Sequence, residues 1–134
     1  MSEVAKKVEE ARRRADLNYF LFLNERAAEE VDLLRKAGRC GALCGVAIAV
    51  KDNIEVAGMP VTNGAPYMRK MGDNTAAVVR RLMAEGAVVI GKTNMHELAL
   101  GATNVNPTSA RLKTLTTRRV LLGAPAGVAR AQWR

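Results

Sequence analysis

Two short apolar runs, each followed at once by polar residues, constrain the fold of this chain most. Residues 45–50 read Gly-Val-Ala-Ile-Ala-Val, and residues 87–90 read Ala-Val-Val-Ile. Runs of this length and composition are typical of strands buried on both faces of a sheet. Between them, Val78, Val79, Leu82 and Met83 fall on one side of a helix that ends before Gly86. A strand, a crossover helix and a second strand predict an α/β fold with the two strands parallel.

Apolar residues at helical spacing also predict two helices before the first strand. The first is capped by Ser2 and turns Val4 and Val8 inward, and the second runs over residues 25–37 and stops at Gly38. Between them, residues 19–23 form an apolar and aromatic run that fits either an extended segment or a buried linker.

Turn and cap residues complete the predicted order of elements. Residues 57–74 are rich in Gly and Pro, so we expect mostly loop, with a residue of 73–75 capping the crossover helix. Asn94 and Glu97 match a capping box for a short helix through Leu100.

Polar residues follow both predicted strands. Lys51, Asp52 and Asn53 come directly after the first strand, and Lys92, Thr93 and Asn94 come directly after the second. The carboxyl ends of parallel strands meet at one edge of a sheet, and α/β proteins commonly place their sites there. We therefore expect both groups on one functional edge.

The formal net charge of +8 is distributed unevenly along the 134 residues. Residues 108–134 hold six of the 21 basic residues and none of the 13 acidic ones, so residues 1–107 carry only +2. The basic tail has no aromatic stacking pattern and no nucleic-acid motif, and no apolar run approaches the length of a membrane span. We expect no direct binding to nucleic acids or membranes, and a cytoplasmic location.

Several blocks in order and spacing resemble the amidase signature family. Residues 45–53, which end in Lys-Asp-Asn, resemble its GVPxxVKDN block, with Ala47 where the family usually has Pro. Residues 91–101 resemble its GKTNMxExA block, and the likeness covers about residues 40–107. The resemblance implies an N-terminal fragment of the mixed α/β sheet of that family, flanked by helices.

The resemblance also implies a chemistry, which is hydrolysis of a carboxamide by a serine, a second serine with a cis peptide bond, and a lysine. Lys51 stands at the lysine position, where burial against apolar residues would lower its pKa so that it could take a proton. The resemblance places further residues at the active-site edge, which are Asp52, Asn53, Thr93, Asn94, Gly101, Ala102 and Thr103. These residues either bind substrate or only form turns and the end of the short helix. No cofactor and no metal are implied.

The serine loop of the family, of GSSGGS type, is absent from the chain. Ser109 has no family block around it, so we reject it as the nucleophile. We tested whether the tail is the family sequence in a shifted reading frame. Each shifted codon takes the third base of one residue's codon and the first two bases of the next. Such codons permit HFGPAKNPHDPA over residues 108–119 and GSSGGS over 122–128, which resemble the missing family blocks. We therefore predict a one-base deletion near codon 108. Residues 1–107 would be a partial amidase-signature domain, and 108–134 an out-of-frame, poorly ordered tail.

Three functions remain open at this stage. The first is hydrolysis of a small-molecule amide, with the present chain inactive alone because it lacks the serines. The second is that of the glutamine-hydrolysing component of a tRNA-dependent amidotransferase, which works with partner subunits, and the third is a non-catalytic fragment. His96 is expected at the surface or at a helix cap, and Cys40 and Cys44 as reduced thiols.

Overall fold

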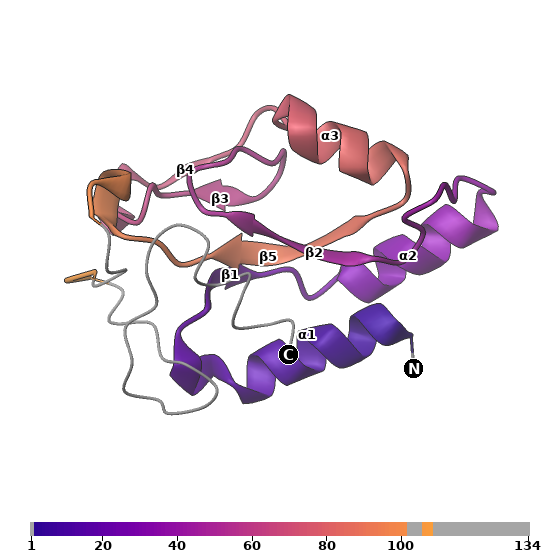
Figure 1. Ribbon diagram of the computed structural model, residues 1–134, viewed down its shortest axis with the longest axis horizontal. Coiled ribbons are helices and arrows are strands. Elements are labelled where there is room, and N and C mark those ends of the chain that lie inside the picture. The colour runs from indigo at the N-terminus through magenta and orange to yellow at the C-terminus, as the bar shows by residue number, and fades with distance from the viewer. Residues whose placement is uncertain (1, 102–105, 109–134) are drawn as a thin grey trace.

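A three-stranded mixed sheet with helices on both faces forms the centre of the molecule (Figure 1). The computed structural model describes residues 2–101 and 106–108. The sheet has the order β1-β5-β2, and a separate pair is formed by β3 and β4. The elements are α1 (Glu3–Arg13), β1 (Phe20–Leu23), α2 (Ala27–Lys36), β2 (Ala47–Lys51), β3 (Pro60–Val61), β4 (Lys70–Met71), α3 (Ala77–Ala84) and β5 (Val88–Thr93), with 3-10 turns at Ala15–Leu17, Pro66–Met68 and Glu97–Ala99. The predicted α/β class is confirmed.

The two predicted buried strands lie side by side and parallel, as the crossover pattern requires. Ala47 pairs with Val88 at one end of β2, and Lys51 pairs with Thr93 at the other. β1 pairs with the opposite side of β5 in the antiparallel sense, so residues 19–23 are largely an edge strand. Both strands extend beyond their predicted ends. Backbone pairing continues past each apolar run and includes Lys51 in β2 and residues 91–93 in β5.

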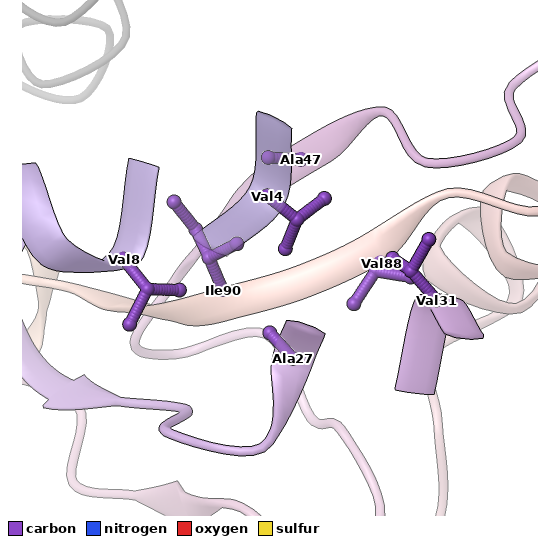
Figure 2. Close-up of a cluster of buried hydrophobic side chains, with 7 residues drawn as sticks. All are labelled: Val4, Val8, Ala27, Val31, Ala47, Val88 and Ile90. Carbon is purple, nitrogen blue, oxygen red and sulfur yellow. The ribbon is translucent and has the colours of Figure 1, made fainter. Parts of the chain in front are cut away.

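Helices α1 and α2 cover one face of the sheet. Their apolar residues meet those of β2 and β5 in one buried cluster (Figure 2), which consists of Val4, Val8, Ala27, Val31, Ala47, Val88 and Ile90. The Ser2 hydroxyl accepts a hydrogen bond from the Ala5 amide at 3.2 Å, which confirms the predicted cap of α1. The inward positions follow directly from the helical spacing of apolar residues in the sequence.

Helix α3 lies on the other face, on the same side as β3 and β4 (Figure 1). Val79 of α3 packs with Val50 and Val89 of the sheet and with Val56 and Met59 of the following loop.

The predicted cap of α3 by a residue of 73–75 is wrong. Ala76 occupies the cap position without a side-chain bond. The Thr75 hydroxyl instead accepts from the Ala57 amide at 3.1 Å, so it joins two loops.

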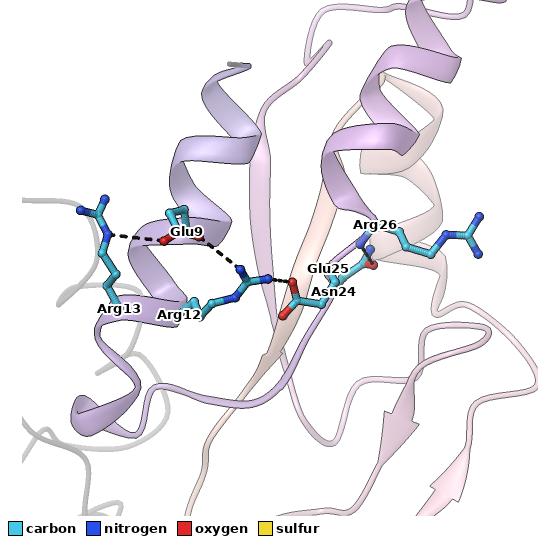
Figure 3. Close-up of polar contacts among 6 residues, drawn as sticks. All are labelled: Glu9, Arg12, Arg13, Asn24, Glu25 and Arg26. Atoms are coloured by element: carbon cyan, nitrogen blue, oxygen red, sulfur yellow. Dashed lines mark hydrogen bonds and ion pairs between the residues drawn. The ribbon is translucent and has the colours of Figure 1, made fainter.

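Asn24 ties the end of β1 to the central strand and starts α2. Its backbone amide donates to the Ile90 carbonyl, its side-chain amide donates to the Val89 carbonyl at 2.9 Å, and its side-chain oxygen accepts from the Arg26 amide. Beside it, Arg12 of α1 bridges Glu9 and Glu25 (Figure 3). Such exposed ion pairs contribute about 0–1 kcal/mol each, so the buried amide of Asn24 is the firmer link.

Cys40 and Cys44 are joined by a disulfide in the segment between α2 and β2. The prediction of reduced thiols is therefore wrong for this structure. A spacing of four residues leaves the pairing undetermined in sequence, because it depends on how the turn folds between them.

The structure bears in different ways on the predictions about membrane spans, metal sites and the C-terminal tail. Residues 2–101 and 106–108 contain no helix long and apolar enough to cross a bilayer. In the same residues no three His, Cys, Asp or Glu side chains gather as metal ligands would. Almost all of the predicted out-of-frame tail, 108–134, lies outside the described residues, so its predicted state stays a prediction.

Candidate active site

Lys51 and Thr93 stand opposite each other at the carboxyl ends of β2 and β5. The chain then turns, and the Asp52 amide donates to the Thr93 carbonyl at 3.2 Å. Lys51 is half-buried, Asp52 and Thr93 are buried, and Asn53 is exposed. The structure therefore brings Lys51, Asp52, Thr93 and the adjoining Asn94 to one edge of the sheet, as predicted from the parallel crossover.

The Asp52 carboxylate faces away from solvent and organises the loop after β3. Its Oδ2 atom accepts from the Thr62 hydroxyl at 2.6 Å, and from the Thr62 and Gly64 amides at 3.0 Å each. Only 1% of Asp52 is exposed, and its Oδ1 atom is buried without a hydrogen-bond partner. Three donors on one carboxylate oxygen hold the turn after Lys51 against residues 62–64.

Lys92 was expected at this edge together with Thr93 and Asn94, but the sequence predicted no role for its side chain. Its side chain is fully buried, and its Nζ atom donates to the Asp52 carbonyl at 3.1 Å and to the Pro60 carbonyl at 3.2 Å. Burial lowers the pKa of Lys92 below its usual value of 10.5, while the nearby carboxylates of Asp52 and Glu55 oppose this shift. The sequence held one indication of this burial. Lys92 stands only two residues after the apolar run 87–90, so a slightly longer strand would include it.

Asn94 closes the edge on the side of β1. Its side-chain amide donates to the Asn18 carbonyl at 3.1 Å, and its side-chain oxygen accepts from the Met95 amide. The predicted capping box with Glu97 is wrong, because the short 3-10 turn begins after His96 and the Glu97 carboxylate accepts from the Tyr67 hydroxyl. Asn94 thus links the end of β5 to the segment just before β1 and does not cap a helix.

The remaining predicted site residues are less closely connected to Lys51. Asn53 is exposed, within the turn closed by the Ile54 amide and the Lys51 carbonyl. Gly101 lies against the ring of His96, which stands at the cap position of the 3-10 turn without a cap bond. Ala102 and Thr103 lie outside the described residues.

The arrangement places the lysine of the predicted chemistry at the carboxyl edge of the sheet, but no serine of the described residues lies beside it. The chain contains two serines. Ser2 caps α1, and Ser109 lies outside the described residues. A partly exposed amine on a rigid backbone can exchange a proton with a hydroxyl brought to it. The roles of Lys51 and of the other site residues stay predictions.

Comparison with known proteins places the chain in a family. The family model described as Amidase matches residues 2–118. The chain is 37% identical over 101 residues to a glutamyl-tRNA(Gln) amidotransferase subunit of Methanosarcina mazei, which is 75% of this chain and 21% of that protein. It is 48% identical over 79 residues to indoleacetamide hydrolase of Pseudomonas syringae pv. syringae, which is 58% of this chain and 17% of that protein.

A solved structure gives the same result for the fold. A crystal structure of an amidase superimposes with a TM-score of 0.81 at 30% identity, and the match covers 98% of this chain and 32% of that one. The chain spans about a fifth of the length of the curated relatives. On these matches, the chain belongs to the Amidase family.

Proposed function

We propose that the complete form of this protein hydrolyses a small-molecule carboxamide to a carboxylate and ammonia, with Lys51 as its proton-transfer residue. The observation that carries this proposal is the place of Lys51 at the shared carboxyl edge of β2 and β5, half-buried and followed by a tightly bound Asp52. Amide hydrolases among the relatives, such as indoleacetamide hydrolase, support the reaction class.

The proposed chemistry needs two serines that the chain does not supply. One serine attacks the amide carbon, and its proton passes through the second serine to the Lys51 amine. The tetrahedral intermediate then collapses, the C–N bond breaks, and Lys51 returns the proton to the leaving ammonia. Water hydrolyses the resulting acyl ester by the same path in reverse order. Lys51 therefore acts first as a base and then as an acid.

The 134-residue chain is inactive by itself under this proposal. We infer that residues 1–107 are a partial catalytic domain and that residues 108–134 are read out of frame, since the shifted codons permit the missing GSSGGS loop. Sequencing the gene tests this directly. Codons 122–128 that do not spell this loop in the other frame would refute the deletion.

The activity test compares the present chain with the frame-restored protein. We expect the restored protein to release ammonia from indoleacetamide or a related aryl amide, and the present chain to release none. Lys51→Ala in the restored protein should lower the rate by about 10²-fold or more, in the range of general acid–base catalysis. Turnover by the present chain that Lys51→Ala abolishes would contradict its inactivity.

The second candidate is the glutamine-hydrolysing component of a tRNA-dependent amidotransferase. It is favoured by the identity to the amidotransferase protein of Methanosarcina mazei over three quarters of this chain. Partner subunits would then be required, and the restored protein would release ammonia from glutamine only in their presence with misacylated tRNA. Hydrolysis of aryl amides by the restored protein alone would favour the first candidate. A cytoplasmic location is proposed for either.

A further inference from the structure

The buried ammonium of Lys92 contacts the backbone of Asp52, the residue that follows Lys51. None of its surface is exposed, and its Nζ atom contacts two carbonyl oxygens from segments that are distant in sequence. One carbonyl belongs to Asp52, the residue after Lys51, and the other belongs to Pro60, the first residue of β3. The ammonium therefore joins the end of β2 to the start of β3.

Asp52 is held from both of its ends. Its carbonyl accepts from Lys92, while its carboxylate accepts from Thr62 and Gly64 on the same loop that Pro60 begins. Lys92 holds the carbonyl of the peptide after Asp52, and the amide of the peptide before it donates to the Thr93 carbonyl. Neither peptide next to Asp52 can therefore rotate without breaking one of these bonds. A side chain attached to such a clamped backbone starts from one fixed direction.

A purely structural role explains Lys92 poorly. Burial of an ammonium costs several kcal/mol before compensation, and burial lowers the pKa of Lys92. An apolar side chain of similar length would fill the same space without that cost. What an apolar side chain cannot do is donate to two carbonyls at once, which is the feature that bears on the Lys51 backbone.

We propose that Lys92 is a positioning residue for Lys51, which it orients by clamping the Asp52 and Pro60 carbonyls. This role rests on the proposed function in one respect, since orientation matters only if Lys51 is the reacting amine. The clamp itself can be tested without any turnover.

The test measures how fast Lys51 of the 134-residue protein is acylated by an N-hydroxysuccinimide ester of acetate, using peptide mass spectrometry. Exposed Lys6 of α1 serves as the internal reference in every sample. With the clamp removed in Lys92→Met, Lys51 should be acylated several-fold faster relative to Lys6, because its backbone is released. Lys36→Met, which removes an exposed lysine of α2, should leave the ratio unchanged.

An unchanged ratio in folded Lys92→Met, with folding checked by circular dichroism, would overturn the proposal. Lys92→Gln, which keeps N–H donors without the charge, should give an intermediate ratio, and it decides the matter if the Met variant does not fold. The wild-type protein gives an independent result by ¹⁵N NMR, since a clamped Lys92 ammonium must exchange with water far more slowly than that of Lys6. Equal exchange rates would also overturn the clamp.

These outcomes are separate from those of the proposed function. A restored protein without amidase activity, together with a changed acylation ratio, would remove the reaction and retain the clamp. A restored protein with amidase activity, together with an unchanged acylation ratio, would retain the reaction and remove the clamp.

Discussion

The carboxylate of Asp52 makes the strongest single-residue prediction for stability. Asp52→Ala leaves three donors of Thr62 and Gly64 without their acceptor. Since each buried donor without a partner costs about 1–3 kcal/mol, the free energy of unfolding should fall by at least about 2 kcal/mol in urea titrations. Asp52→Asn should cost less, because an amide oxygen can still accept these bonds.

Exposed Asp73 provides the control for that series. Asp73→Ala should change the free energy of unfolding by no more than about 0.5 kcal/mol, as is usual for surface positions. Equal losses for the two alanine variants would show that the Asp52 bonds contribute nothing specific.

Lys92 also makes a prediction for the pH dependence of stability. Burial lowers the pKa of Lys92 in the folded state below its usual 10.5, so the unfolded chain binds more protons between the two values. Stability contributed at this residue must therefore rise with pH through that interval and level off above about 10.5. The measurable quantity is the difference in unfolding free energy between wild type and Lys92→Gln at several alkaline pH values, in which other titrations cancel. A difference that falls with pH would contradict the lowered pKa.

At the residue scale, sequence reasoning located the edge but not its support. Lys51, Asp52, Thr93 and Asn94 were predicted together because the ends of parallel strands meet, and the register of β2 and β5 confirms this placement. Lys92 was expected at this edge as well, but its burial and its bonds to two carbonyls were not predicted, because the strand was predicted to end at Ile90. Backbone pairing, which no side-chain pattern records, carries β5 on to Thr93.

At the scale of elements, apolar periodicity was a better guide than polar caps. Both strands and all three long helices occur near their predicted places, since burying an apolar face requires them. The caps by Thr75 and by Asn94 failed because the Thr75 hydroxyl accepts from the Ala57 amide and the Asn94 side chain donates to the Asn18 carbonyl instead. Short polar side chains satisfy whichever backbone group lies nearest, and that depends on tertiary structure.

The pairing of β1 with β5 depends on a glycine. A Cβ atom added to Gly91 would lie 2.3 Å from the Phe22 carbonyl oxygen, which is backbone and cannot swing away. Gly91→Ala should therefore separate the two strands and lower the free energy of unfolding by roughly 1–3 kcal/mol or more. Amide hydrogen exchange should show lost protection in β1 before β2.

Gly38 is the matched control for this substitution. It has a φ of +65° and nothing within 4 Å of an added Cβ, so Gly38→Ala meets only the backbone penalty of about 1–2 kcal/mol. Exchange in β1 should be unaffected by it. Equal effects of both substitutions on β1 would contradict the steric explanation.

At the scale of the whole molecule, the described residues leave apolar side chains and strand edges uncovered. Tyr67, Met68 and Met71 are exposed around β4, and Val78 is exposed on α3. In the described sheet, β1 and β2 each have a neighbour on one side only. Uncovered strand edges and apolar patches promote association between chains. The 134-residue protein should therefore self-associate.

The net positive charge of the molecule opposes that association. Two substitutions can separate the effect of apolar contact from the effect of charge. Met71→Lys adds one positive charge to the exposed strand β4, whereas Asn74→Lys adds the same charge to an exposed polar position three residues away. If apolar contact at β4 drives association, sedimentation velocity should show a clear loss of larger species for Met71→Lys and little change for Asn74→Lys. Equal effects would mean that net charge controls association, because both variants add the same charge and only Met71→Lys removes exposed apolar surface. A monomer at every concentration in the wild type would contradict the role assigned to the uncovered edges.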